Sequence, residues 1–157
     1  MDSDDDETGS NTADHFIRHV TVRQLLEADQ MHSTAPFKIE DKEFKKFILV
    51  ANICYLDECE TYRDIGLDDG TGRIKAREWD ENEILERKSN RKSFQVSNFP
   101  YVHVVGELEQ YRNRNTIKVM DIEAVTNAYE PYYHVLHAVH DTLVYERGPP
   151  VSHIHQS

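Results

Sequence analysis

The sequence contains very little cysteine and no long apolar segment. Cys54 and Cys59 are its two cysteines, and two thiols five residues apart form neither a disulfide framework nor a zinc site with four ligands. This low cysteine content predicts a reducing, intracellular compartment. No apolar run approaches the roughly 20 residues that a membrane-spanning helix needs. The first residues also lack the basic and apolar stretches of a secretory signal, so we expect no such signal.

Positive charge is scarce as well. The 157 residues include 18 Lys and Arg but 29 Asp and Glu, a net charge of -11, which argues against a protein that holds nucleic acid by bulk charge alone. Six of the acids and no Lys or Arg fall within residues 1–14, which predicts a disordered acidic tail over residues 1–17. At the other end, the run Gly148-Pro149-Pro150 predicts that residues 148–157 form a tail or the start of a linker.

Sequence motifs of catalysis are absent too. The chain has no nucleophile elbow, phosphate-binding loop, metalloprotease helix or dinucleotide fingerprint, so we expect neither an enzyme nor a cofactor. His134, His137 and His140 recur at a spacing of three, and imidazoles at that spacing can share a metal. Successive steps of three drift around a helix, however, and no cysteine or carboxylate completes the set. We therefore predict no metal site.

What the sequence does contain is a series of β-patterned segments. Five of them alternate or are rich in β-branched and aromatic residues: Phe44–Leu56, Tyr62–Leu67, Arg73–Trp79, Tyr101–Tyr111 and Thr116–Val125. Tight turns are predicted at Asp69-Gly70-Thr71-Gly72 and at residues 112–115. Because no long helical crossover separates the strands, they predict an all-β chain with flanking helices, a five-stranded Greek-key OB-fold barrel over residues 18–128. Another small barrel or a sandwich would also fit this pattern.

Helical signals flank the predicted barrel and interrupt it once. Thr21 is a good N-cap for a short helix through Leu26, and Pro131 suits the first turn of a C-terminal helix within residues 129–147. Residues 80–99 are polar, and we expect a loop there with a short helix near Glu81–Arg87.

The C-terminal helix carries an apolar stripe. Its members fall at steps of four, three and four, with one more residue that broadens it: Tyr132, Leu136, Val139, Leu143 and Val135. Such a stripe either packs back on the barrel or docks on partner helices. The near-heptad spacing, and a barrel that has already closed its own core, favour docking on a partner.

A second group of residues joins rings with cations. In Arg73–Trp79, alternation turns Ile74 and Ala76 to one side and the basic residues with Trp79 to the other. The last hairpin adds a ring at Tyr111 with further cations. The predicted nucleic-acid-binding residues are Trp79, Tyr111, Arg77, Lys75, Arg73, Arg112, Arg114 and Lys118. Rings that stack unpaired bases beside cations that contact phosphates are typical of single-stranded nucleic-acid binding. The alternative is that Trp79 packs beneath a loop and the cations pair with the abundant acids.

Three segments resemble the middle subunit of replication protein A, a eukaryotic heterotrimer that binds single-stranded DNA. They are Val20–Leu26, Leu67–Trp79 with its Arg-x-Trp end, and Val105-Gly106-Glu107-Leu108 leading to Tyr111. The resemblance extends from about Val20 to Arg147. It implies that Trp79 and Tyr111 stack bases while Arg77 and the cations of the last hairpin contact the backbone. It also implies that Pro131–Arg147 joins a three-helix bundle with one helix from each of the large and small subunits, in a nuclear complex for DNA replication, repair and recombination.

The sequence departs from this family in two places. The family's longer Ser/Thr-rich, phosphorylated N-terminal arm is here short and acidic, and its C-terminal winged-helix module is not found before Ser157. Two other binding or assembly functions stay open. One is a telomere-capping OB subunit of the Stn1 type, and the other is a purely structural subunit with little DNA contact.

Overall fold

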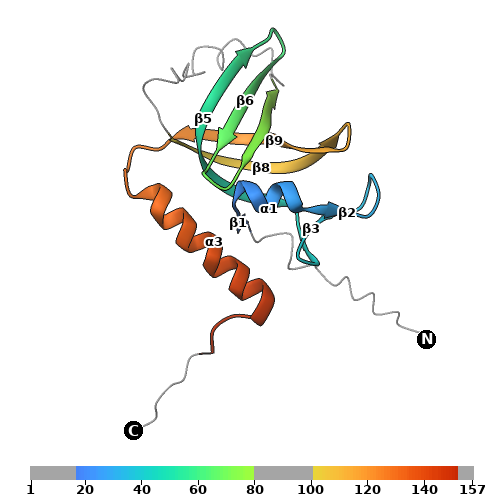
Figure 1. The fold of residues 1–157 in the computed structure, drawn as a ribbon, viewed down its shortest axis with the longest axis vertical. Coiled ribbons are helices and arrows are strands. Elements are labelled where there is room, and N and C mark those ends of the chain that lie inside the picture. The colour runs from blue at the N-terminus through green and yellow to red at the C-terminus, as the bar shows by residue number, and fades with distance from the viewer. Residues whose placement is uncertain (1–16, 80–100, 152–157) are drawn as a thin grey trace, which may run out of the picture.

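The computed structural model describes residues 17–79 and 101–151, and the five longest strands among them build one closed β-barrel (Figure 1). The barrel strands are β5 (Lys46–Glu58), β6 (Tyr62–Asp68), β7 (Arg73–Trp79), β8 (Tyr101–Tyr111) and β9 (Arg114–Ala124). The predicted acidic tail except its last residue, Ile17, the whole predicted 80–99 loop with its short helix, and residues 152–157 lie outside the described part of the chain.

The strand order confirms the five-stranded OB-fold. Hydrogen-bonded neighbours run β5-β6-β7-β9-β8, and β8 pairs back on β5 to close the barrel. All of these pairings are antiparallel except β7 with β9, which is parallel with Ala76 opposite Ile117. Alternate side chains of each strand fill the interior, where Phe47, Leu67 and Val104 are fully buried. Gly106 lets β8 approach β9 closely, because a Cβ there would lie 2.8 Å from Ile117 Cγ2.

The structure contains short strands that the sequence did not predict. β1 (Arg18–His19) pairs in parallel with the start of β5, and β2 (Asp29–Gln30), β3 (Phe37–Ile39) and β4 (Lys42–Phe44) form a small separate sheet. The predicted first strand, Phe44–Leu56, is therefore divided, with Phe44 in β4 and the barrel strand starting at Lys46.

The last hairpin is tighter than predicted. Arg112 and Asn113 have φ values of 50° and 60°, and Tyr111 pairs directly with Arg114. Two left-handed residues close a two-residue hairpin whose twist matches that of the strands. As a result, β9 begins at Arg114 rather than at Thr116.

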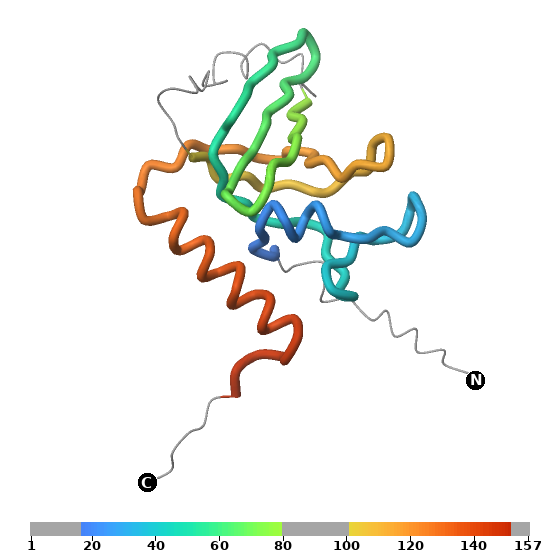
Figure 2. Tube along the Cα trace, viewed as in Figure 1, coloured from blue at the N-terminus to red at the C-terminus, as the bar shows by residue number. Residues whose placement is uncertain are grey.

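Helix α1 (Val22–Glu27) closes one end of the barrel. Thr21 caps it as predicted, with its side chain accepting from the Gln24 backbone N–H. Figure 2 shows the chain passing from α1 into the β2–β4 sheet before it enters β5.

Helix α3 (Glu130–Arg147) runs alongside β1 after leaving the barrel (Figure 1). Its N-terminal turn holds Pro131, as the sequence predicted, and Gly148 ends it with a φ of 80°. No helix among the described residues combines the length and the apolar character that crossing a membrane requires.

Candidate nucleic-acid interface

Strand register gathers polar and aromatic side chains on one outer face of the barrel. Across β6 and β7, Tyr62 pairs with Trp79, Asp64 with Arg77 and Gly66 with Lys75, while the residues between these pairs point inward. Arg77 also pairs with Lys118 on β9, and Gly66 with Tyr55 on β5. The outer face, as named from here on, comprises Tyr55, Tyr62, Asp64, Gly66, Lys75, Arg77, Trp79 and Lys118.

Trp79 stands at one end of the outer face and is 43% exposed. The Tyr62 ring lies beside it, with 5.3 Å between the ring centroids and an angle of 58° between the planes. The Arg77 guanidinium lies 3.9 Å from the Tyr62 ring centroid and 5.3 Å from that of Trp79. A cation over two rings holds the rings in place while leaving much of the indole open.

Acidic side chains occupy the same face and pair with the cations of β7. Arg77 donates to both oxygens of Asp64 at 2.7 and 2.9 Å, and Lys75 Nζ lies 2.8 Å from Asp64 Oδ2. These hydrogen bonds, first that from Arg77, hold the pKa of Asp64 below its usual range. At the edge of the face, Arg73 pairs with Asp68 at 2.7 Å. The three β7 cations thus pair with acids, as the alternative in the sequence analysis predicted. Trp79, which that alternative placed beneath a loop, is not enclosed among the described residues.

The β8–β9 hairpin carries the second predicted ring away from the first. Tyr111 is 62% exposed at the hairpin end, and Arg112 places its guanidinium 5.2 Å from the Tyr111 ring centroid. Arg114 is exposed opposite Tyr111. Figure 1 shows this hairpin projecting from the barrel in a different direction from the β5–β6 hairpin. Lys118 lies further along β9, beside Arg77, and so links the hairpin strand to the outer face.

Sequence reasoning missed three side chains of the outer face, as well as Gly66. Tyr55, Tyr62 and Asp64 lie on β5 and β6, and they join the predicted β7 residues only through strand pairing. The outward position of Tyr62 and Asp64 follows from alternation with buried Ile65 and Leu67, so the pattern of β6 contained a signal for these two. For Tyr55 no such signal existed, because a bulge between Ile53 and Tyr55 breaks the alternation.

The predicted apolar stripe of α3 is exposed along the helix. Leu136 is 66% and Val139 is 54% exposed, and Tyr132, Val135 and Leu143 are also open to solvent. The buried residues of α3 are His134, Ala138 and Asp141, which lie on the opposite side of the helix. The helix therefore does contact its own barrel, but with a different face from the stripe.

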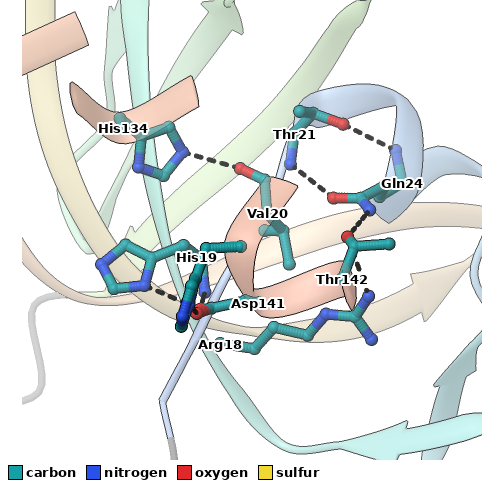
Figure 3. A network of polar contacts seen from close by, with 9 residues as sticks. Arg18, His19, Val20, Thr21, Gln24, His134, Asp141 and Thr142 are labelled. Carbon is teal, nitrogen blue, oxygen red and sulfur yellow. Dashed lines mark hydrogen bonds and ion pairs between the residues drawn. The ribbon is translucent and has the colours of Figure 1, made fainter. Parts of the chain in front are cut away.

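Polar contacts attach that opposite face to β1 and α1 (Figure 3). Asp141 accepts hydrogen bonds from the backbone N–H of His19 at 2.7 Å and from its ring at 2.8 Å. His134 contacts the Val20 carbonyl oxygen at 2.8 Å, and Gln24 donates to Thr142 at 3.0 Å. Burial raises the pKa of Asp141, but the hydrogen bonds from His19 outweigh it and leave that pKa below its usual range.

Two of the α3 histidines, His134 and His137, pack against the segment that contains β1. His134 is buried against β1, and the His137 ring stacks on His19 with 4.8 Å between centroids. Burial lowers the pKa of His134 and favours its neutral form. Among the described residues, no group of three histidine, cysteine or acidic side chains is placed to hold a metal ion.

Comparisons with known proteins agree with this architecture. The chain matches no protein-family model. It is 27% identical to Replication factor A protein 2 of Schizosaccharomyces pombe over 127 residues, which cover 81% of this chain and 43% of that protein. The chain thus spans about half or less of the length of the curated relatives it matches.

Solved structures extend the likeness to three dimensions. A chain in a structure of a replication protein A heterotrimer bound to ssDNA superimposes with a TM-score of 0.68 at 30% identity, covering 82% of this chain and 96% of that one. A chain of the Schizosaccharomyces pombe Stn1–Ten1 complex also gives a TM-score of 0.68, but at 12% identity, covering 85% and 96%. The second likeness shows a shared fold alone.

Proposed function

Because the chain belongs to the family of replication protein A middle subunits, we propose that it binds single-stranded DNA as a non-catalytic subunit of a heterotrimer. The relative of known structure belongs to a heterotrimer bound to ssDNA. The observation that carries the proposal is the half-open Trp79 ring, set beside Arg77 and Tyr62 on the outer face. In this proposal the complex acts in the nucleus, in DNA replication, repair and recombination.

In the proposed interface, rings supply most of the binding free energy. Bases stack on Trp79 and Tyr111, at about 1–3 kcal/mol for each base. Arg112, Arg114 and Lys118 contact phosphates, since none of the ion pairs among the described residues includes them. The β7 cations contribute less than their number suggests, because Asp64 and Asp68 already neutralise part of their charge. A net charge of -11 further weakens binding by the isolated chain.

Replacing both rings tests the DNA-binding proposal. We expect Trp79→Ala with Tyr111→Ala to weaken DNA affinity at least about 20-fold, since two stacked bases are lost. Fluorescence anisotropy with labelled oligothymidine measures the change, and Tyr129→Ala, which removes an exposed tyrosine next to α3, is the control. Unchanged affinity in the double variant, at low salt as well as high, would instead support a purely structural subunit.

The second part of the proposal concerns assembly. The exposed stripe of α3 docks on one helix from each of the large and small subunits, forming a three-helix bundle. The stripe is free for this role because α3 already contacts its own barrel through His134 and Asp141 on the other side. The accompanying domain division is a barrel over residues 18–128 and a docking helix over residues 129–147.

Charged substitutions in the stripe test assembly. Leu136→Asp with Val139→Asp should abolish co-purification with the large and small subunits, because docking would then bury unpaired carboxylates. Tyr133→Asp is the matched control, since Tyr133 is exposed but lies about 100° around the helix from Tyr132. Co-purification of the double variant with its partners would contradict the docking proposal.

Preference for telomeric overhangs over generic single strands would favour the Stn1-type alternative.

A further inference from the structure

Tyr55 occupies a position on the outer face that the proposed function does not use. It lies on β5, next to Gly66 on β6, which in turn pairs with Lys75 on β7. This row lies two residues along the strands from the row of Asp64 and Arg77, and four residues from the row of Tyr62 and Trp79. The rows of Tyr55 and Trp79 are thus about 13 Å apart along the same sheet, from the rise of about 3.3 Å per residue.

A glycine opposite Tyr55 lets its ring lie against the strand. A Cβ on Gly66 would come within 2.2 Å of the ring carbons Cδ1 and Cε1 of Tyr55, so any side chain there would displace the ring. Even in this close position Tyr55 remains 47% exposed. The ring is therefore held on the backbone of β6 without being covered, which is the arrangement a flat ligand needs.

The surroundings of this ring match the chemistry of a nucleotide. Lys75 lies in the same row and supplies a cation next to the ring. Its partner carboxylate, Asp64, is shared with Arg77, so Lys75 Nζ is held near the outer face by a single contact of 2.8 Å. A ring for the base and an adjacent ammonium for the phosphate are the two elements by which single strands are bound.

We propose that Tyr55, seated on Gly66 beside Lys75, is a third base-stacking ring, and that the single strand crosses this row as well as that of Trp79. The inference rests on the proposed function, since it extends the same DNA-binding surface. Tyr55 acts as a preformed platform, because its contact with Gly66 fixes the ring before the strand binds.

Affinity measurements on the full chain with labelled oligothymidine test the inference. Tyr55→Ala should weaken binding about five-fold or more, since the loss of one stacked base costs at least about 1 kcal/mol. Tyr55→Phe should retain the affinity because it keeps the ring. Gly66→Ala keeps the tyrosine but displaces its ring, so it should also weaken binding. The Tyr55→Ala, Gly66→Ala double variant should bind no worse than Tyr55→Ala alone, because both changes remove the same interaction. Tyr129→Ala is the exposed-tyrosine control.

Photo-crosslinking gives a second readout that does not depend on the stability of a variant. An iodouracil-substituted oligonucleotide bound to the wild-type chain should crosslink to Tyr55, as identified by mass spectrometry of the digested complex. The inference would be overturned if Tyr55→Ala binds with wild-type affinity and no crosslink to Tyr55 forms. If Trp79→Ala binds weakly in the same assay, the proposed function still stands. If Trp79→Ala and Tyr111→Ala also bind normally, the proposed function itself fails.

Discussion

Asp64 should oppose DNA binding while it orders the outer face. Within the described ranges it is the one carboxylate that contacts both Lys75 and Arg77, so it cancels one unit of charge where phosphates are proposed to bind. Asp64→Asn keeps a hydrogen-bond acceptor for Arg77 but removes that negative charge. We therefore expect this variant to bind single-stranded DNA more tightly than the wild type.

The size of the effect follows from counterion release. Each phosphate contact on a single strand contributes a slope of about -0.7 to the dependence of log affinity on log salt. Freeing one cation of the outer face should steepen the slope by about that amount. The ratio of the variant's DNA affinity to that of the wild type should therefore fall about 2.5-fold between 50 and 200 mM salt. Anisotropy titrations of both proteins across this range measure the two slopes.

A matched variant separates local from global charge. Glu27→Gln removes the same charge from α1, where Glu27 pairs with Arg23 outside the outer face. It should leave the salt slope nearly unchanged. If Asp64→Asn has the wild-type slope and affinity, or if Glu27→Gln raises affinity equally, Lys75 and Arg77 are not phosphate contacts.

Acid titration checks the ion pairs of Asp64 independently. Its pKa is lowered in the folded chain, mainly by Arg77, so the folded state holds fewer protons than the unfolded state near pH 4. The pairs therefore stabilise the fold fully above an unfolded pKa of about 3.9, and this stability is lost as pH falls through the lower folded pKa. Chemical denaturation should show this acid-dependent loss in the wild type and a smaller one in Asp64→Asn.

Three further predictions concern the fold. Because burial lowers the pKa of His134, its neutral form stabilises the α3 contact above about pH 6.5, and the hydrogen-exchange protection factors of the β1 amides, which correct for the intrinsic rate at each pH, should fall as pH drops below that value. A His134→Gln chain with the same pH response would contradict this. Asp141→Ala should cost about 1.5–3 kcal/mol in denaturant unfolding, since the His19 backbone N–H loses a charged acceptor; a loss below about 0.5 kcal/mol would refute that role. Gly106→Ala should cost about 1–3 kcal/mol in the same assay, because its Cβ would lie 2.8 Å from the Lys118 carbonyl oxygen. Wild-type stability would show that β8 can shift.

The barrel was predictable because its strands are long and alternate clearly. β7 has the predicted bounds, with buried Ile74 and Ala76 between outward residues. The β2–β4 sheet was not predictable in the same way, since its strands have two or three residues and show no periodicity that could be recognised. The Arg112–Asn113 turn was predicted too long because it contains no glycine, although asparagine also tolerates a positive φ.

The candidate site was predictable only within single strands. Alternation placed Trp79 and Arg77 on one side of β7, and the helical period placed Leu136 and Val139 on one stripe. Which acids pair with the cations depends on register between strands, and this information is absent from any one segment. The roles of His134 and His137 were not predicted for the same reason, because their contacts lie more than 110 residues away, at Val20 and at His19 of β1.

Contacts around α1 join the segment before the barrel to the Asp-Gly-Thr-Gly turn. Asp69 accepts from the backbone N–H of Val22 at 2.9 Å, and the Thr71 hydroxyl accepts from the next N–H at 3.0 Å, so the turn caps the helix N-terminus. At the other end, Asn115 donates to the carbonyl oxygens of Leu25 and Ala28 at 2.8 and 3.0 Å.

Helix α1 is therefore fixed at one end to the β6–β7 turn and at the other to the β8–β9 hairpin. Since β7 carries Trp79 and the hairpin carries Tyr111, the helix restrains the separation of the two proposed stacking rings. Asn115→Ala should consequently weaken DNA binding although Asn115 itself contacts α1, and the loss should disappear in a chain that already contains Tyr111→Ala. An undiminished loss in that background would mean that α1 supports the barrel without positioning the hairpin.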